Sequence, residues 1–488
     1  MPEHNTSPLF LAGEWADGSE GSVLEVENPA DESVAGRVAE ASLTDLERAV
    51  AGARRAQPAW AARTVAERAA VLVRLAELIE ADTERLAAIL VAEAGKPIAE
   101  ARGEVAGAAG FCRFFAGIAP VQGGEILPSA RRNAEIWIRR EPVGVVGGII
   151  PWNFPLALTA RKLAPALVSG NALVLKPAEL TPLSALAVAD LAERAGVPAG
   201  VLSVLPGPGA TLGAALVRMP GVDFVTMTGS VRAGRSILRD AAERIIPVSL
   251  ELGGKAPFIV FDDADINAAV EAAVTTRMMN NGQACVCNER TYVQRGSFDR
   301  FVAAYAARLD SLQLGDPRAE STQVGPKISR RELENVERIV AEAVDAGATV
   351  VTGGERPSGG AFDLGHWYRP TLLVDVADDA AVMREEIFGP VTPIVPFDRE
   401  EDAVRLANDT EYGLSSYIYT EDLSRAMRMT RAVRSGEIFI NRPGPEEPSG
   451  FHGGWGSSGL GGDDGTHGLE LYSRKQTVYV SWQDRAGR

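Results

Sequence analysis

The 488 residues are 46% hydrophobic and 23% charged, as in an ordinary globular protein, and this length predicts about three domains at roughly 150 residues each. The formal net charge of −16 argues against a nucleic acid or an anionic membrane as a partner. We expect a cytoplasmic protein, because the sequence shows no secretory signal, no apolar run long enough to span a bilayer and only three cysteines.

The N-terminal part of the chain is expected to be mainly helical after an irregular first segment. Thr64 and Glu67 have the spacing of a capping box, which predicts the start of a helix. A later helix, predicted over residues 98–118, carries Cys112 among phenylalanines. We therefore expect Cys112 to pack in the core.

Beyond residue 142, short apolar runs alternate with helical segments. The runs cover residues 143–150, 172–175, 201–205, 224–227 and 248–252. Buried strands that alternate with helices predict a doubly wound parallel sheet, whose ligands lie beyond the carboxyl ends of the strands. Those ends carry Pro151, Lys176, Gly207, Thr228 and Glu251.

A second α/β series is expected from about residue 255 to 440, followed by a glycine-rich loop over 450–468. Two further strands, near residues 135–140 and 476–482, have no sheet of their own in this pattern. Because an exposed strand edge usually finds a partner, we expect these strands to pair with each other and with another subunit.

Glycine-containing turns at the strand ends are suited to a dinucleotide. The turn over 207–213 has one residue too many for the G-x-G-x-x-G fingerprint, and alone it indicates a turn and a helix start. Gly229 and Ser230 open a helix whose free N–H groups can bind phosphate oxygens. Lys176 and Glu179 end another strand, and a carboxylate there would accept from both ribose hydroxyls and repel a 2′-phosphate. Together these turns indicate a nucleotide site that favours NAD over NADP.

Cys285 lies on a turn between a predicted helix and a predicted strand. Most such cysteines are small buried apolar residues, so a chemical role requires partners elsewhere in the chain. Glu251 would be a general base beside a reactive cysteine, although capping or ion pairing is the commoner role. Asn153, between two prolines, is suited to an oxyanion hole. Glu386 and Phe388 lie on a turn that could also be only a structural anchor.

Six segments stand in a characteristic order and spacing along the chain. They are 151–155 (PWNFP), 176–179 (KPAE), 228–230 (TGS), 251–255 (ELGGK), 282–285 (GQAC) and 386–390 (EIFGP). In these segments the chain resembles the NAD(P)-dependent aldehyde dehydrogenase superfamily. The resemblance implies an α/β fold with a Rossmann-type NAD-binding domain (1–130 and 143–254), an α/β catalytic domain (255–465) and a small β-arm for oligomerisation (131–142 and 466–488). It also implies a homo-oligomer, expected as a tetramer built from dimers.

The same resemblance assigns roles to individual residues. Cys285 would be the nucleophile, Glu251 the base, and Asn153 with the Cys285 backbone N–H the oxyanion hole. The residues expected to hold NAD are Pro151, Trp152, Lys176, Glu179, Gly209, Gly213, Thr228, Gly229, Ser230, Leu252, Glu386 and Phe388. No metal site is implied.

The expected chemistry follows from these residues. A thiolate adds to an aldehyde, and the amide of Asn153 stabilises the tetrahedral oxyanion by about 3 kcal/mol. Loss of hydride to the nicotinamide leaves a thioester on Cys285, which Glu251 hydrolyses by activating water. A glutamate at this position favours hydrolysis over transfer of the acyl group to coenzyme A.

Within the superfamily, the paired cysteines at 285 and 287 and the residues Arg161, Glu446 and His452 resemble the lactaldehyde/glycolaldehyde dehydrogenase group. The three latter side chains would contact the hydroxyl or aldehyde oxygens of a small substrate. The alternative for each is a structural ion pair or loop hydrogen bond. An anionic three-carbon aldehyde bound by Arg161, or another semialdehyde, is the alternative substrate.

The sequence argues against two other classes of function. A non-catalytic structural relative would have lost a reacting residue, yet Cys285, Glu251 and Asn153 are all present. A cysteine hydrolase would need a histidine base, and the sequence shows no family-like pairing of a histidine with Cys285.

Overall fold

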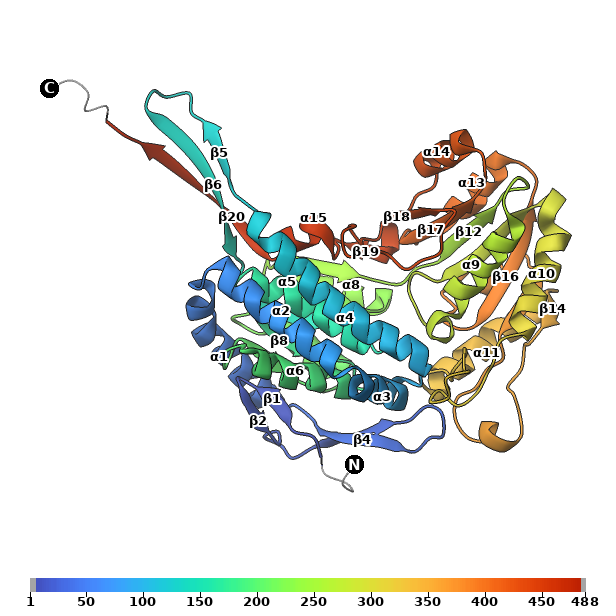
Figure 1. Ribbon diagram of the computed structural model, residues 1–488, viewed down its shortest axis with the longest axis horizontal. Helices are drawn as coiled ribbons and strands as arrows, with labels where there is room; N and C mark the ends of the chain where they lie inside the picture. The colour runs from blue at the N-terminus through green and yellow to red at the C-terminus, as the bar shows by residue number, and fades with distance from the viewer. Residues whose placement is uncertain (1–5, 484–488) are drawn as a thin grey trace.

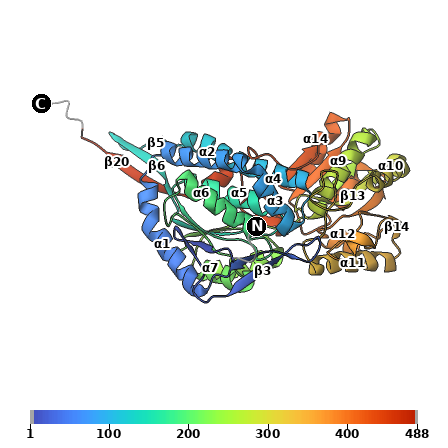
Figure 2. The same ribbon diagram turned by 60° about the horizontal axis from the view of Figure 1, so that its bottom comes forward.

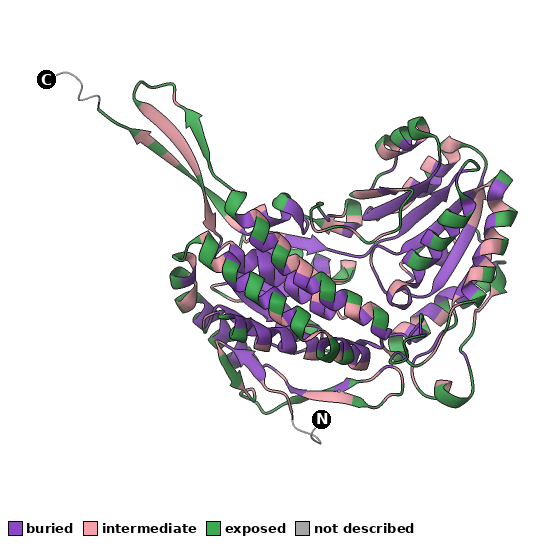
Figure 3. Ribbon diagram, in the orientation of Figure 1, coloured by how far each residue is buried: buried purple, intermediate pink, exposed green. Residues whose placement is uncertain are grey.

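The computed structural model describes residues 6–483, arranged as two mainly parallel sheets with their helices and a projecting three-stranded arm (Figure 1). Residues 1–5 and 484–488, the outer ends of ranges predicted for the cofactor domain and the arm, lie outside the described residues. The strands of both large sheets are mostly buried, whereas the strands of the arm are intermediate or exposed (Figure 3). The predicted α/β architecture is confirmed.

The first sheet has a parallel centre and antiparallel edges, in the order β19-β11-β10-β7-β8-β9-β1-β2. Its parallel strands are β7 (Val145–Ile149), β8 (Ala172–Lys176), β9 (Leu202–Val204), β10 (Phe224–Thr228) and β11 (Val248–Glu251). Its edge strands are β1 (Leu9–Leu11), β2 (Glu14–Ala16) and β19 (Gly459–Leu460). Because β19 pairs with β11, a segment from the range predicted for the catalytic domain completes the sheet of the cofactor domain.

Helices cover both faces of this sheet, as a doubly wound fold requires (Figure 2). One face carries α2 (Val65–Ala81), α3 (Thr83–Ala94), α4 (Ile98–Ile118), α5 (Pro155–Val168) and α6 (Leu183–Ala195). The other face carries α1 (Leu43–Ala61), α7 (Ala214–Arg218) and α8 (Val231–Ala242). A separate apolar cluster fills each layer. A turn of π-helix, Gly209–Gly213, precedes α7 where the sequence predicts a turn and a helix start.

The predicted start of α2 is confirmed by its hydrogen bonds. Thr64 Oγ1 accepts from the Glu67 N–H at 3.2 Å, and the Glu67 carboxylate accepts from the Thr64 N–H at 2.7 Å. Both contacts satisfy N–H groups that the first helical turn leaves free. Cys112 on α4 is fully buried, as expected.

One described helical segment, Ile98–Val121, is long and apolar enough by length and composition to cross a membrane, with a mean hydropathy of 1.2. The sequence led us to expect no such run, and that expectation was wrong. In the fold, α4 lies against α2, α3 and α5, and its apolar side chains join the core of the first domain. Only 39% of the apolar window is buried, so one face of α4 packs against these helices, and small residues such as Ala99, Ala106 and Gly107 make up much of its exposed face.

The second sheet has the order β14-β15-β16-β13-β12-β17-β18. Its strands are β12 (Ala256–Val260), β13 (Asn288–Gln294), β14 (Thr349–Thr352), β15 (Thr371–Val374), β16 (Val391–Phe397), β17 (Ser415–Tyr419) and β18 (Glu437–Ile440). Its main helices are α9 (Ile266–Met278), α10 (Phe298–Asp310), α11 (Arg330–Asp345), α13 (Glu400–Asn408) and α14 (Leu423–Ala432). Two short helices complete the chain. α12 (Ala381–Arg384) stands between β15 and β16, and α15 (Gly465–Glu470) stands between β19 and the last strand of the chain.

The arm is a sheet of β20 (Ser473–Ser481), β6 (Ala134–Pro142) and β5 (Glu125–Pro128), in that order (Figure 1). The expected pairing of the two isolated strands is confirmed, because β20 runs antiparallel to β6 from Ser473↔Pro142 to Ser481↔Ala134. The third strand, β5, lies within the range 1–130 that the sequence assigned to the cofactor domain. A separate two-stranded ribbon consists of β3 (Val23–Glu27) and β4 (Val34–Ala39).

Candidate active site

The turn that carries Cys285 meets the carboxyl ends of β7 and β11, where the two large sheets face each other. Cys285 follows α9 and a short turn in which Asn280 and Asn281 have left-handed φ values of 50° and 57°. The backbone of this turn lies directly against Gly254, where an added Cβ would stand 2.4 Å from the Cys285 carbonyl oxygen. Only glycine therefore allows the strand end after β11 to approach the nucleophile turn so closely.

Cys285 is half-buried. Burial raises the pKa of its thiol, and the neighbouring His452 side chain acts in the opposite direction. Cys287 differs sharply, because its Sγ donates to the Thr276 carbonyl at 3.0 Å and burial raises its pKa to about 12. Cys287 is thus an inert wall residue, whereas Cys285 faces polar groups.

Asn153 is held by its own backbone and by its side chain. Its carbonyl accepts from Lys96 Nζ at 3.0 Å and from Asn280 Nδ2 at 2.8 Å. Its Nδ2 donates to the Gln283 carbonyl at 3.0 Å. An amide has two N–H groups, so one remains for an oxyanion formed beside Cys285.

Lys96 and Glu104 form a buried ion pair that positions Asn153, and the sequence did not lead us to either residue. Lys96 also lies over the ring of Phe154 at 3.7 Å. Glu104 accepts from the N–H groups of Leu156 and Ala157 at 2.9 and 3.1 Å, at the start of α5. The sequence did contain a signal for this pair. Glu104 stands among alanines on one face of α4, and an acid on a buried face needs a partner.

Glu251 lies at the end of β11 with only 2% of its surface exposed. Neither of its carboxyl oxygens has a hydrogen-bond partner among residues 6–483. Burial raises the pKa of Glu251 to about 8. A carboxyl group with a pKa near neutrality can act as a general base on water, as the sequence predicts for this residue.

His452 lies at the centre of a buried group of acids. Its Nδ1 is 3.0 Å from Glu437 and 3.8 Å from Glu446, and its Nε2 is 3.5 Å from Glu251. Burial alone would lower the pKa of this ring, but the carboxylates of Glu446 and Glu437 raise it well above its usual range. The structure thus places His452 among three acids, one of which is the predicted base Glu251.

Arg161 is buried and committed to carboxylates. Its Nε donates to Asp464 at 3.0 Å, a second nitrogen pairs with the same carboxylate, and a third lies 3.0 Å from Glu446. The neighbouring Lys162 pairs with Asp463 at 2.6 Å. The structure thus gathers Arg161, Glu446 and His452, and places the guanidinium in the ion pair that was the alternative to direct substrate contact. The two adjacent aspartates were missed, although a pair of acids inside a glycine-rich run was the visible signal.

The residues expected at the adenosine end of a dinucleotide follow the carboxyl ends of the central strands of the first sheet. Lys176 is buried, and its Nζ is 3.1 Å from Glu179. A Cβ added to Gly209 would stand 3.6 Å from the same Nζ. Ser230 caps α8 by accepting from Ala233 N–H at 3.3 Å, close to the free N–H groups of that helix. Thr228 Oγ1 is buried without a partner among the described residues, as a group that awaits a ligand would be.

The residues expected at the nicotinamide end lie near Gly254. Glu386 accepts from the Gly254 N–H at 2.8 Å, and burial raises its pKa to about 8. The rings of Trp152 and Phe388 meet edge to face at 5.3 Å. The remaining members of the predicted cofactor set, Pro151, Gly213, Gly229 and Leu252, follow the same strand ends or open the helices after them. This arrangement fits a dinucleotide laid across the carboxyl edge of the sheet.

Glu289 fixes the turn that carries Glu386. Its carboxylate lies 2.8 Å from Lys255 and 2.7 Å from Arg277, and accepts from the N–H groups of Ile387 and Phe388 at 2.8 and 3.1 Å. Burial alone would raise the pKa of Glu289, but the two cations lower it to about 2. The carboxylate is therefore always charged and always paired.

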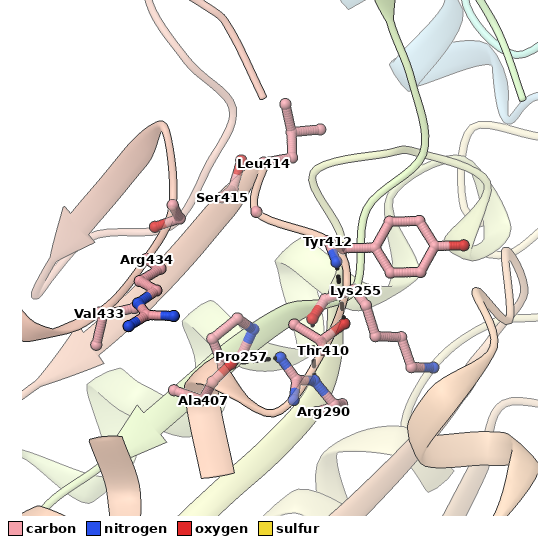
Figure 4. A pocket seen from close by; sticks show the side chains of 12 residues that line it. Lys255, Pro257, Arg290, Ala407, Thr410, Tyr412, Leu414, Ser415, Val433 and Arg434 are labelled. Carbon is pink, nitrogen blue, oxygen red and sulfur yellow. Dashed lines mark hydrogen bonds between the residues drawn. The ribbon is translucent and has the colours of Figure 1, made fainter. Parts of the chain in front are cut away.

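A small pocket behind Lys255 does not include Cys285, Glu251 or Asn153 (Figure 4). The guanidinium of Arg290 donates there to the carbonyls of Lys255, Leu406 and Ala407 at 3.0, 2.9 and 2.8 Å. All three acceptors are backbone atoms, so this pocket is part of the structural support.

Comparison with known proteins shows the family of the chain. A sequence model described as the aldehyde dehydrogenase family matches residues 15–478. The chain is 51% identical to 3,6-anhydro-alpha-L-galactose dehydrogenase of Streptomyces coelicolor over 96% of both chains. The structure of 3,6-anhydro-L-galactose dehydrogenase in complex with NAP superimposes with a TM-score of 0.96 at 42% identity, covering 98% of this chain and 100% of the other. Lactaldehyde dehydrogenase from Escherichia coli superimposes with a TM-score of 0.95 at 43% identity, covering 97% and 99%. The chain therefore belongs to the aldehyde dehydrogenase family, whose members oxidise aldehydes with NAD(P).

Proposed function

We propose that this enzyme oxidises a small, neutral, hydroxylated aldehyde to its carboxylate with NAD. The supporting observation is the excess of carboxyl groups over cationic groups in the buried cluster around His452 and Arg161. The cluster contains five carboxyl groups and three cationic groups, namely Glu251, Glu437, Glu446, Asp463 and Asp464 against Arg161, Lys162 and His452.

An anionic substrate would meet an excess of acid in this cluster. Arg161, the cation that could bind a substrate carboxylate, already pairs with Asp464 and Glu446. Moving the carboxylate of a substrate into this buried site, where no cation is free to pair with it, costs several kcal/mol. A hydroxyl group, in contrast, can donate to the acids. This contrast favours lactaldehyde or glycolaldehyde over a semialdehyde.

The names of two relatives support the same class of substrate, whereas other relatives are named for glutarate semialdehyde and succinate semialdehyde, the anionic alternative. One is named for lactaldehyde and another for 3,6-anhydro-alpha-L-galactose. Both names describe uncharged aldehydes that carry hydroxyl groups, which is why a cyclic sugar aldehyde is the second candidate.

The side chains of this chain divide the reaction into two stages. In the first, Cys285 adds to the carbonyl carbon, and the free N–H of Asn153 stabilises the developing oxyanion. NAD, when bound, accepts the hydride from this adduct. In the second stage, Glu251 takes a proton from water, which attacks the thioester on Cys285 and releases the carboxylate.

We propose NAD as the preferred cofactor because Glu179, fixed by Lys176, would repel a 2′-phosphate. The relative solved with NAP makes the phosphorylated cofactor the alternative. The three free cysteines support a cytoplasmic location.

We also propose that the arm joins subunits into a homo-oligomer, expected as a tetramer built from dimers. Large apolar side chains are exposed on the outer strands of its sheet, including Ile126 (71%) and Tyr479 (78%). Such an edge is suited to pairing with another chain.

Glu251→Gln should retain a first burst of NADH but lower steady-state turnover at least 100-fold, because acylation needs no water activation and deacylation does. In the native enzyme, turnover limited by deacylation should rise as the pH passes through about 8, because the base acts only after losing its proton. Stopped-flow and steady-state absorbance measure both. Cys285→Ser, the comparison, should show neither phase, and loss of the burst in Glu251→Gln would contradict a deacylation role.

Lactaldehyde should be oxidised with a kcat/KM at least 10-fold above that for malonate semialdehyde, which has the same carbon number but carries a carboxylate. Asp464→Asn should narrow this ratio. The change removes one negative charge and leaves the guanidinium of Arg161 partly free to pair with the carboxylate of the semialdehyde. The measurement is kcat/KM for both aldehydes with both proteins. A native preference for the semialdehyde would exclude the neutral-substrate proposal.

Glu179→Gln should increase the NADP/NAD ratio of kcat/KM about 10-fold, because it removes the charge that opposes a 2′-phosphate. The ratio is measured at one saturating aldehyde concentration. An unchanged ratio would show that Glu179 does not set the cofactor preference.

Ile126→Glu should lower the molar mass in solution, because it places a charge on an apolar strand of the arm. Leu423→Glu is the matched control, since Leu423 is 74% exposed on α14, outside the arm. Light scattering coupled to gel filtration gives the mass of each protein. Equal masses for the native protein and Ile126→Glu would remove the arm from the interface.

A further inference from the structure

Phe388, on the turn expected beside the nicotinamide, has a backbone conformation that a bulky residue rarely adopts. Its φ of 51° lies in the left-handed region, which strains a residue with a large side chain and persists only where neighbouring groups enforce it. Glu289 binds the N–H groups of Ile387 and Phe388 at 2.8 and 3.1 Å. These bonds fix one side of the strained peptide, so its carbonyl needs a partner as well.

Lys327 supplies that partner. Its Nζ donates to the Phe388 carbonyl, and its side chain is fully buried. A Cβ added to Gly389 would stand 3.5 Å from the same Nζ, so the amine lies directly against the turn. Among residues 6–483, Nζ makes no other hydrogen bond or ion pair. Burial lowers the pKa of this amine to about 7, and either protonation state keeps an N–H for the carbonyl.

The segment that carries Lys327 also binds the nucleophile turn. The N–H of Ile328 donates to Gln283 Oε1 at 3.0 Å. The two turns lie directly against each other as well, because a Cβ added to Gly282 would stand 2.2 Å from the Gly389 carbonyl oxygen. Two adjacent residues, 327 and 328, therefore hold the nicotinamide turn and the nucleophile turn at a fixed separation.

We propose that Lys327 is a positioning residue for hydride transfer, which fixes the Phe388 peptide and thereby sets the place of the nicotinamide relative to Cys285. The role rests on the proposed function, in which the nicotinamide lies beside Glu386 and Phe388. In this step the C–H bond of the Cys285 adduct breaks, and the hydrogen passes with its electron pair to the nicotinamide, which is reduced. The adduct carbon is oxidised to the thioester. Lys327 acts on these atoms only through the turn.

The other charged groups at the turn cannot replace Lys327. A carboxylate such as Glu289 accepts hydrogen bonds and has none to donate to a carbonyl. Arg277 donates instead to the Gly389 carbonyl, one residue further along, and lies 2.7 Å from Glu289. Without the amine, the Phe388 carbonyl would lose its donor, and the peptide could relax from its strained conformation.

Such a relaxation would displace the ring of Phe388, which meets the ring of Trp152 edge to face at 5.3 Å. Trp152 directly precedes Asn153, the residue that stabilises the oxyanion. Hydride transfer requires close alignment of donor and acceptor, and a misplacement of about 1 Å can lower a rate about 100-fold. The contact of Lys327 is therefore expected to matter for the rate of this step more than for the binding of either ligand.

The first measurement uses neither aldehyde nor cofactor. Hydrogen exchange followed by mass spectrometry reports how firmly the turn over residues 386–390 is held in the free enzyme. Lys327→Met keeps a long side chain but removes the donor, and it should speed exchange in this turn at least 10-fold. Arg330→Met is the matched control, because Arg330 lies in the same segment with its side chain 55% exposed. Its exchange in the turn should be native.

The second measurement separates hydride transfer from binding. Lys327→Met should slow the burst of NADH in stopped flow at least 10-fold, with a larger isotope effect for an aldehyde deuterated at its carbonyl carbon and a KM for aldehyde within twofold of native. This is the opposite of Glu251→Gln, which keeps the burst. ADP-ribose, which lacks the nicotinamide, should bind the native and variant proteins with the same Kd in titration calorimetry.

Lys327→Leu serves if the methionine variant melts at a lower temperature, and it should change exchange and burst in the same directions. Native exchange over 386–390 in both variants would overturn the proposal, and so would faster exchange with a native burst. Weaker binding of ADP-ribose would also overturn it, because the effect would then extend beyond the nicotinamide end. A native enzyme that forms no NADH from any aldehyde would refute the proposed function, whereas the exchange measurement tests the hold of Lys327 on the turn independently.

Discussion

A single buried carboxylate, Glu289, holds the catalytic parts of this enzyme in register. It pairs with Lys255, which follows the Gly253-Gly254 link from β11, and with Arg277 at the end of α9. It also binds the backbone of the turn that carries Glu386 and Phe388. The strand end with the base, the helix before the nucleophile and the nicotinamide turn are therefore tied to one group. Removing that group would leave two buried cations unpaired, which costs about 3 to 5 kcal/mol.

Much of the fold could be predicted because its signals are local. Apolar runs of strand length alternate with helical segments, and this alternation indicates parallel strands wherever it occurs. Strands without such a pattern were missed. β5 is four residues long and exposed, and β19 is two residues long inside a glycine-rich loop. Each becomes a strand only because a neighbouring strand, β6 or β11, offers a free edge.

The residues of the candidate site also fall into two groups, those that lie in local sequence motifs and those whose role depends on contacts between distant parts of the chain. Cys285, Glu251 and Asn153 lie in motifs with a recognisable order, so they could be named in advance. Asp464 could not, because its role depends on a contact with Arg161 across 303 positions of the chain. In a sequence, a buried aspartate and a solvated one are identical letters. The same holds for Glu437, whose carboxylate lies 3.0 Å from Nδ1 of His452.

The strand β19 has a mechanical consequence. It reaches from the C-terminal loop to pair with β11 beside Glu251, and the Leu252 N–H donates to the Ser458 carbonyl just before it at 2.9 Å. Backbone hydrogen bonds thus join the C-terminal loop, which follows the second sheet, to the first sheet next to Glu251. A hinge motion that separated the two sheets would have to break the hydrogen bonds between β19 and β11 and displace Glu251. We therefore expect cofactor and product to exchange through loops and side chains at the rim, while the two sheets stay docked.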